Sequence, residues 1–154
     1  MNNKILITGA TGFVGSHLLQ MALAQNRQVI CPVRTQSSTT DAWVSHISSI
    51  DSKTDWQAHL TNVNTVIHCA ARVHVMNDTA ADPLLAFREV NLYGSLRLAE
   101  QAAAAGVSQF IYLSSIKVNG ELTSDGTAFT EDDTPQASDP YGISKQEAET
   151  ALLE

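Results

Sequence analysis

Four short runs of apolar residues, interrupted by few polar ones, are spaced along the chain. A strand that is buried on both faces has such a run, whereas an amphipathic helix repeats its apolar residues every three or four positions. We therefore predict buried strands over these runs, at Lys4–Thr8, Gln28–Arg34, Asn64–Ala71 and Ser108–Ser115. The polar, Ser/Thr-rich stretch after the second strand predicts a loop, with a further short strand near Ile47–Ile50.

Segments with helical spacing lie between the predicted strands. They predict a helix from Phe13 to about Asn26, a weak one within residues 55–63, a long one over Pro83–Ala105 and a last one from Tyr141 onward. Proline in the first turn and glycine after the last turn are typical of helix ends, which fits Pro83 and Gly106. Strands alternating with helices predict an α/β fold, a doubly wound parallel sheet with helices on both faces.

Length and charge limit the function classes. The chain has 154 residues and a formal net charge of -7. This length is typical of one domain with a core of its own. The acidic balance argues against a nucleic-acid-binding protein, because such proteins neutralise phosphates with basic side chains. The sequence has no apolar run of about 20 residues and no leader pattern, so we expect no membrane span and a cytoplasmic protein.

The cysteines and histidines suggest no metal site and no disulfide. Cys31 and Cys69 lie in apolar runs and form no CxxC pair, so we expect two buried, reduced thiols. No grouping of His, Cys, Asp and Glu has metal-ligand spacing. His68 lies inside an apolar run, which favours a hydrogen-bonded core histidine.

The first candidate site is the stretch TGATGFVGSH, where Gly9, Gly12 and Gly15 recur at intervals of three. A glycine turn between a first strand and a first helix is typical of dinucleotide-binding, Rossmann-type domains. Gly9 allows a tight turn, Gly12 lets a pyrophosphate approach the backbone, and Gly15 lets the helix pack on the sheet. The phosphates would lie at the helix N-terminus, where free N–H groups and the helix dipole favour negative charge.

The end of the second predicted strand bears on the choice of cofactor. An acidic residue there binds the ribose 2′-hydroxyl of NAD, and an arginine accepts the 2′-phosphate of NADP. The segment CPVRTQSS has no acidic residue, and Arg34 is followed by hydroxyl side chains. This favours NADP(H), with NAD(H) as the alternative cofactor and a solvated Arg34 as the alternative interpretation.

The second candidate site is the segment YGISK, in which Tyr141 and Lys145 are four residues apart on one face of a helix. A tyrosine with a pKa of about 10 is a poor base, but a neighbouring ammonium group favours the phenolate. Ser114 and Ser115 come at the end of a predicted strand, where ligands bind in open α/β sheets. A tyrosine, a lysine and a serine in this order indicate acid–base chemistry at a carbonyl or an alcohol.

Taken in order, the motifs TGATGFVG, VIHCAA, EVNLYGS, FIYLSSIKVNG and YGISK resemble the extended short-chain dehydrogenase/reductase family. These are the NAD-dependent epimerases and dehydratases that act on nucleotide sugars. The resemblance covers essentially the whole chain. It is closest to the UDP-glucose 4-epimerase-like and 4-keto-sugar reductase branches, which act in polysaccharide biosynthesis.

The resemblance implies a role for each matching residue. Ser115 corresponds to the catalytic serine, Tyr141 to the acid–base and Asn91 to the helix asparagine that supports the site. Lys145 would hold the nicotinamide ribose and lower the pKa of Tyr141. The cofactor would contact the glycine turn, the backbone N–H groups after it and the end of the third long strand, which are Gly9, Gly12, Phe13, Val14, Gly15, Ala70 and Ala71.

Some positions depart from the family pattern. An acidic residue that contacts adenine corresponds to Asp51, unless Ser49 is the aligned position. The 4,6-dehydratases of the family carry Asp-Glu after the catalytic residue, whereas this chain has Ile116 and Lys117, which argues against dehydration. Lys117 and His74 lie where a sugar would bind, and each is predicted as either a substrate contact or an ordinary loop residue.

The resemblance implies hydride exchange at a sugar carbon, C4 of a UDP-sugar, by an epimerase or a reductase. The family continues beyond the helix that contains Tyr141, so we expect residues 1–154 to be a Rossmann domain without its C-terminal, substrate-binding region. Family dimers often pair through two long helices, here Pro83–Ala105 and the one from Tyr141. The alternative hypothesis is a non-catalytic NADP(H)-binding sensor module or an inactive fragment.

Overall fold

The structure is a computed structural model that describes residues 4–34, 43–73, 80–123 and 126–154. Within these ranges, one parallel sheet contains the strands β1 (Lys4–Thr8), β2 (Gln28–Val33), β3 (Val44–His46), β4 (Val63–His68) and β5 (Gln109–Tyr112). The order across the sheet is β3-β2-β1-β4-β5. Because the order reverses beside β1, the crevice where ligands bind in such sheets is expected beyond the ends of β1 and β4.

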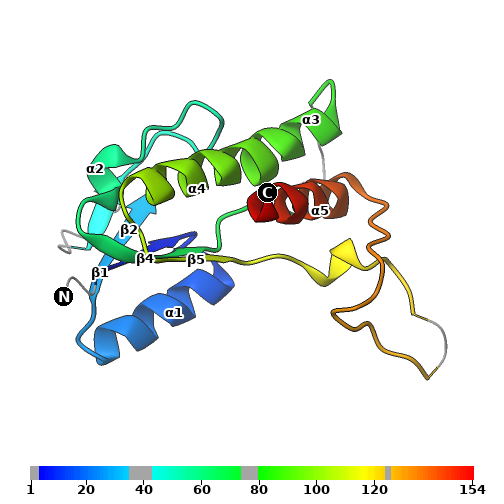
Figure 1. Cartoon of the computed structure of the whole chain (residues 1–154), viewed down its shortest axis with the longest axis horizontal. Helices are drawn as coiled ribbons and strands as arrows, with labels where there is room; N and C mark the ends of the chain where they lie inside the picture. Colours follow the sequence, from blue (N-terminus) through cyan, green and yellow to red (C-terminus); the bar gives the residue numbers. More distant parts are fainter. Residues whose placement is uncertain (1–3, 35–42, 74–79, 124–125) are drawn as a thin grey trace.

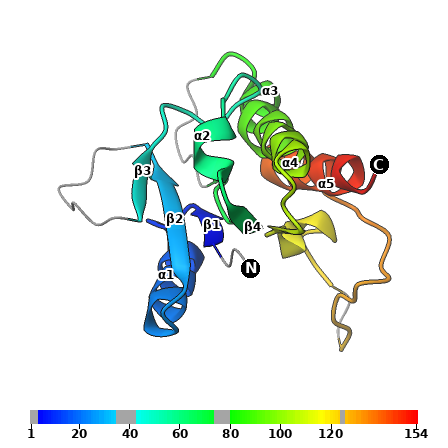
Figure 2. The ribbon, with the colours of Figure 1, turned by 60° about the vertical axis from the view of Figure 1, so that its left-hand side comes forward.

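Helices cover both faces of the sheet, which confirms the doubly wound fold (Figure 1). Helix α1 (Phe13–Ala24) lies on one face, and α4 (Gly94–Ala104) and α5 (Pro140–Leu153) lie on the other. Figure 2 shows β3 at one edge of the sheet, with the short helix α2 (Gln57–Leu60) on the side of α4. Among the described residues, no helix is both long and apolar enough to cross a membrane.

Two hydrophobic cores lie under these helices. Leu6 and Ile7 are neighbours in β1, yet they belong to different cores because successive side chains of a strand point to opposite faces. The core around Ile7 contains Leu19 of α1, and the core around Leu6 contains Leu98 of α4. Burial on both faces explains why the central strands are apolar throughout.

The central strands end at one level, which is earlier than we predicted for β4 and β5. Thr8, His68 and Tyr112 are in register across the sheet, and Gly9 turns the chain away with φ +68°. The predicted strand ends at Ala71 and Ser115 were therefore wrong. The residues after each strand leave the sheet and form loops at its carboxyl edge.

The short strand is also displaced from its predicted position. It runs over Val44–His46, where it pairs with Cys31–Val33 of β2, and not over Ile47–Ile50. Ile47 is 5% exposed and packs in the core with Trp56 and Leu60. The two isoleucines of this segment are apolar because Ile47 lies in that core and Ile50 packs against it.

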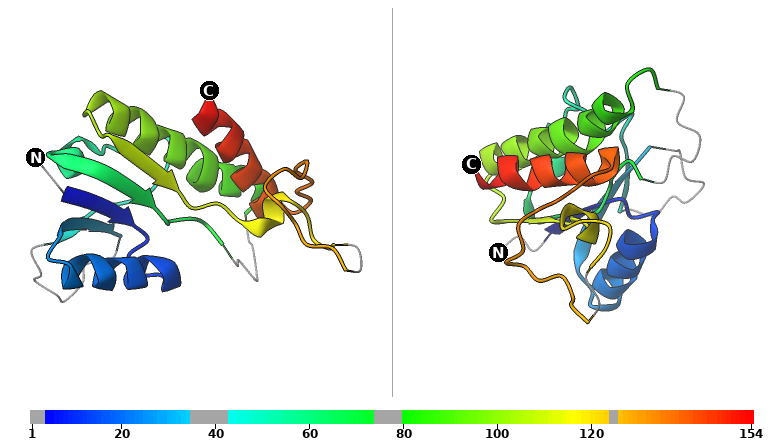
Figure 3. Two further views of the ribbon diagram at one scale, coloured as in Figure 1. Left: turned by 60° about the horizontal axis from the view of Figure 1, so that its bottom comes forward. Right: turned by 90° about the vertical axis from the view of Figure 1, so that its right-hand side faces the viewer.

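The long helix extends over nearly its predicted range. It consists of α3 (Pro83–Arg88), the π-helical turn η1 (Glu89–Tyr93) and α4, with no break between them. The side chain of Asp82 accepts a hydrogen bond from the Leu85 N–H at 3.0 Å and caps its start. The π-helical turn, which contains Asn91, was not predicted. Figure 3 shows the chain between β5 and α5 extending away from the sheet.

Candidate active site

The glycine turn lies against the end of β4. A Cβ atom added to Gly9 would lie 2.7 Å from the backbone nitrogen of Ala70 and 2.9 Å from the carbonyl carbon of Cys69. A Cβ atom on Gly15 would overlap the carbonyl oxygen of Gly9. The N–H of Gly12 donates to the same oxygen at 2.9 Å. Gly9 and Gly15 are therefore required by close backbone packing between β4, the turn and α1.

The N-terminus of α1 is open to a ligand. Gly12 is its N-cap residue, no side chain caps the helix, and no acidic residue lies in its first turn. The first N–H groups of a helix lack intrahelical acceptors and carry the positive end of the helix dipole. Phe13 is 84% exposed, and Val14 is exposed beside it. A cradle of small residues at a free helix N-terminus fits a pyrophosphate group.

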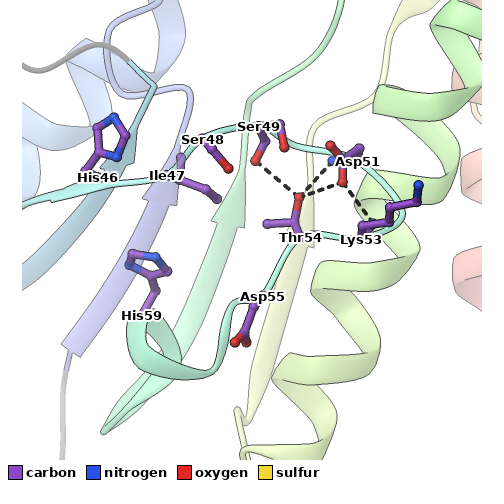
Figure 4. Close-up of a pocket in the computed structure, with 9 residues that line it drawn as sticks. All are labelled: His46, Ile47, Ser48, Ser49, Asp51, Lys53, Thr54, Asp55 and His59. Carbon is purple, nitrogen blue, oxygen red and sulfur yellow. Dashed lines mark hydrogen bonds between the residues drawn. The ribbon is translucent and has the colours of Figure 1, made fainter.

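Arg34 and Asp51, both predicted to contact the cofactor, come after β2 and β3. Arg34 is exposed and follows β2 directly, and its carbonyl oxygen accepts a hydrogen bond from His46 Nε2 at 3.0 Å. The Asp51 carboxylate accepts one from the Lys53 N–H at 2.9 Å and lies 3.2 Å from Thr54 Oγ1 (Figure 4). Hydrogen bonds, with that of Ser49 the strongest cause, hold the pKa of Asp51 below its ordinary value.

A pocket of about 430 Å³ lies between β3 and α2 (Figure 4). Its lining residues are all within one stretch of the chain, namely His46, Ile47, Ser48, Ser49, Asp51, Lys53, Thr54, Asp55 and His59. The lining therefore includes Asp51 and neither the glycine turn nor α5. This pocket is separate from the side chains of the predicted catalytic group.

Helix α5 contains Tyr141 and Lys145 and begins at Pro140. The side chain of Asp139 caps the helix by accepting a hydrogen bond from the Gly142 N–H at 2.6 Å. Lys145 is 1% exposed, and its Nζ donates to the carbonyl oxygen of Leu113 at 2.6 Å. Burial lowers the pKa of Lys145 to about 8. A lysine with this pKa retains much of its charge at neutral pH, inside the protein.

Phe87 of α3 packs beside Tyr141. The centres of the two rings are 6.2 Å apart, in an edge-on arrangement. The guanidinium group of Arg72, in the loop after β4, lies 5.2 Å above the Phe87 ring. The Tyr141 ring therefore packs against Phe87, whose own ring is covered by Arg72.

The segment with Ser115 packs on the start of α5. Ser115 caps the 3₁₀ turn η2 (Ile116–Val118), and its Oγ accepts a hydrogen bond from the Lys117 N–H at 3.3 Å. A Cβ atom on Gly142 would lie 2.9 Å from the carbonyl oxygen of Lys117. The ammonium group of Lys117 pairs with Asp139 and, at 3.1 Å, with Glu121. Ser115 and Tyr141 thus lie on two segments in direct contact.

Asn91 connects the loop after β4 to α5. It is 1% exposed, and its Nδ2 donates to the carbonyl oxygen of Arg72 at 3.1 Å and to Ser144 Oγ at 2.9 Å. Its Oδ1 accepts a hydrogen bond from the Arg72 N–H at 2.8 Å. Ala70 and Ala71, predicted to lie beside the cofactor riboses, belong to this loop. Its position is therefore coupled to the helix that contains Tyr141.

His68 is the buried, hydrogen-bonded histidine that we predicted. Ser95 uses its proton to donate to the carbonyl oxygen of Asn91 at 2.7 Å, so Ser95 Oγ accepts from His68 Nε2 at 2.9 Å. His68 Nδ1 then accepts from Thr8 Oγ1 at 2.6 Å. The Thr8 oxygen in turn accepts from the N–H of Ala70 at 3.1 Å. This network requires a neutral imidazole, and burial lowers the pKa of His68 to about 3.

Other predicted residues gave mixed outcomes. Cys31 is buried and Cys69 is partly buried, and both are free thiols. His74 lies outside the described residues. In the part of the chain that the structure describes, no three His, Cys, Asp or Glu side chains are grouped as metal ligands.

The comparison with protein families decides where the chain belongs. Residues 5–154 match the model of the NAD dependent epimerase/dehydratase family. The chain is a member of that family. The resemblance inferred from its motifs is therefore confirmed.

The relatives of this family member are sugar-nucleotide enzymes. Over 99% of its length, it is 44% identical to a UDP-glucose 4-epimerase from Vibrio cholerae. The match covers 47% of that protein. It thus spans about half the length of the curated relatives that it matches. A short-chain dehydrogenase/reductase superfamily protein from Agrobacterium tumefaciens with bound NAD has a TM-score of 0.79 and 29% identity, with 97% of this chain and 44% of that one covered. MoeE5 in complex with UDP-glucose and NAD has a TM-score of 0.75 and 32% identity, with 97% and 48% covered.

Residues that support the site were missed in the sequence. Tyr112, Phe87 and Ser144 all contact predicted site residues. Each lies in a correctly predicted strand or helix, where an inward-facing side chain could be expected. Its partner belongs to a distant segment, and a single sequence contains no signal for that pairing.

Proposed function

We propose that this chain is the cofactor-binding and catalytic half of an NAD(P)-dependent enzyme acting on a nucleotide sugar. The reaction would be hydride transfer at C4 of a UDP-sugar, as an epimerase or a reductase. The observation that carries this proposal is the start of α5. There Tyr141 lies one helical turn from the buried Lys145, and the segment with Ser115 packs on the same turn. The relative from Vibrio cholerae, a UDP-glucose 4-epimerase, supports the substrate class.

The cofactor proposed is a nicotinamide dinucleotide. The glycine turn and the uncapped start of α1 fit its pyrophosphate. Both solved structures described above contain NAD, which supports NAD(H). The exposed Arg34 directly after β2 favours NADP(H) instead. A direct comparison of the two cofactors is therefore part of the test.

Each catalytic side chain would have one task. Tyr141 would remove the proton from a sugar hydroxyl, or return it, as a general base or acid. The Lys145 ammonium would stabilise the Tyr141 phenolate electrostatically. Ser115 would donate a hydrogen bond to the sugar oxygen at the reacting carbon. The bound nicotinamide supplies hydride acceptance and donation.

The surroundings of Lys117 bear on the choice of reaction. Its ammonium group already pairs with Asp139 and Glu121, and Ile116 precedes it where dehydratases of the family carry an acid. Neither residue offers a carboxylate for the elimination of water. We therefore propose epimerisation or reduction, and not dehydration.

The first test is a fluorescence titration of this chain with NADPH and, separately, with NADH. Saturable binding supports the glycine turn as the cofactor site. A preference for NADPH that is lost in Arg34→Ala would assign the 2′-phosphate to Arg34. If neither cofactor binds, the proposed cofactor site is wrong for this chain.

The second test separates an enzyme from a binding module. Tyr141→Phe should lower turnover of UDP-glucose by at least about 100-fold and leave cofactor affinity nearly unchanged. Tyr93→Phe is a matched control, because it removes the hydroxyl of a tyrosine that is 40% exposed. The assay requires a chain of the length of the relatives. Cofactor binding without turnover by that longer chain would favour the non-catalytic sensor.

A further inference from the structure

Lys145 is almost completely buried and, within the described part of the chain, forms no ion pair with a carboxylate. It is 1% exposed, and its Nζ donates a hydrogen bond to the Leu113 carbonyl oxygen at 2.6 Å. Transferring an ammonium group from water to a protein interior strongly disfavours its charged form. A single carbonyl group compensates for little of that loss. Some other group must stabilise the cation if it is to act on Tyr141.

The Lys145 ammonium group lies over the face of the Tyr112 ring. Lys145 Nζ is 3.8 Å from the centre of the ring, well within the range of a cation–π interaction. Such an interaction is strongest where water is excluded, as it is here. The electron-rich face of the ring therefore supplies the missing stabilisation.

The sheet holds the Tyr112 ring in place. Tyr112 is in register with His68 of β4, and the centres of their rings are 5.9 Å apart. The Tyr112 hydroxyl also donates to the carbonyl oxygen of Asn91 at 3.4 Å. The ring thus has fixed neighbours on two sides and is preorganised for the cation.

We propose that Tyr112 is a positioning residue, whose ring face keeps Lys145 charged and in place for the reaction of Tyr141. The role of Lys145 in this statement rests on the proposed function. The contact between the ring and the cation rests on geometry alone. The two parts can therefore be tested apart.

Other charged or titratable groups also face Lys145. Glu149, one turn further along α5, and Cys69, after β4, both raise the pKa of Lys145, while burial lowers it to about 8. His68 in β4 is neutral, and burial raises the pKa of Tyr112 in β5 well above its ordinary value. A change in the titration midpoint of Lys145 that is caused by altering the Tyr112 ring must therefore be measured with these groups unchanged.

The experiment is an NMR titration of the Lys145 side chain in this chain without cofactor. The Cε and Nζ signals are assigned by their loss in Lys145→Arg. Tyr112→Phe keeps the ring face, so the Lys145 midpoint of this variant should be close to that of the wild type. Tyr112→Leu removes the ring, and its midpoint should fall by about one pH unit, the size expected for a buried cation–π contact.

A second series keeps the proposal falsifiable if Tyr112→Leu does not fold. Phenylalanines with one, two and three ring fluorines replace Tyr112, which weakens the negative ring face at nearly constant shape. The Lys145 midpoint should fall with each added fluorine. Equal midpoints across the series would overturn the proposal.

The readout needs neither a bound cofactor nor turnover, so the failure of the proposed function would not alter it. If the longer chain is active, the alkaline limb of its kcat/KM profile should shift with the same series. If the Lys145 midpoint changes and the kcat/KM profile does not shift, the proposed effect on the reaction of Tyr141 is wrong. The contact between the Tyr112 ring and Lys145 would still stand.

Discussion

Gly9 and Gly106 have similar backbone angles and different surroundings. Their φ values are +68° and +76°, a region that side chains with a Cβ atom rarely adopt. A Cβ atom on Gly9 would lie 2.7 Å from the nitrogen of Ala70, whereas a Cβ atom on Gly106 would point into open space. Gly106 is therefore required by its φ angle, and Gly9 by its φ angle and by close packing.

This difference predicts unequal costs for the same substitution. Gly106→Ala should lower the free energy of unfolding by about 1–2 kcal/mol, the cost of the left-handed conformation. Gly9→Ala should lower it by about 1–3 kcal/mol more, because the new methyl group overlaps the end of β4. Urea unfolding measures both. Equal losses would show that the backbone near Ala70 moves without cost.

Helix α5 is held at several points along its length. Asp139 caps its start, Ser144 accepts a hydrogen bond from Asn91, and Glu147 forms two hydrogen bonds with Arg88 at 2.5 and 2.7 Å. These contacts come from the residue directly before α5 and from the part of the long helix where α3 meets η1. The position of Tyr141 is therefore a property of the whole helix and its neighbours.

The N-cap of α5 allows a prediction of how substitutions at this helix change the stability of the protein. Asp139→Ala removes both the hydrogen bond to the Gly142 N–H and the pair with Lys117, and should lower the free energy of unfolding by about 1 kcal/mol. Asp139→Asn should lower the free energy of unfolding much less, because asparagine is also a good N-cap. Lys117→Met, which removes the partly exposed pairs with Asp139 and Glu121 and leaves the cap intact, should have the smallest effect. Thermal unfolding ranks the three, and equal losses for the alanine and asparagine variants would assign the effect to charge instead of capping.

Across the whole molecule, one buried polar network connects the end of β1, at the glycine turn, with α5. It runs from Thr8 through His68 and Ser95 to Asn91, and from there to Ser144 of α5. It therefore joins β1, β4, η1, α4 and α5. Loss of one member leaves buried polar groups unpaired, which is costly in a low dielectric.

His68 predicts how this network responds to acid. Burial lowers its pKa from 6.5 to about 3 in the folded protein, so below pH 6.5 the unfolded chain binds a proton that the folded protein does not. Stability is therefore lost as the pH falls, by about 2 kcal/mol between pH 6.5 and 5 for this one group. That interval lies above the range in which most carboxylates titrate. Urea unfolding at several pH values should give a flatter curve for His68→Gln, and parallel curves would contradict the assignment.

The order of elements follows from the sequence. Apolar runs such as Lys4–Thr8 are specific to strands buried on both faces, and alternation with helices leaves a parallel sheet as the solution. The glycine turn and the Tyr141–Lys145 spacing are local patterns, so they too are visible without a structure. By contrast, Ile47 and Ile50 are apolar because both pack in or against the core around Leu6, and the assignment of Ile47–Ile50 as a strand was wrong.

The sequence by itself determined which segments form strands and helices, the glycine turn, and the helix face with Tyr141 and Lys145. Each of these depends on residues close together in the chain. The tertiary structure alone decided which residues surround them. Tyr112 meets Lys145 across 33 positions of sequence, and His68 meets Thr8 across 60. The π-helical turn that contains Asn91 likewise appears where the helix packs on α5. Such contacts depend on how β4, β5 and α5 pack, and spacing along a single chain does not encode that packing locally.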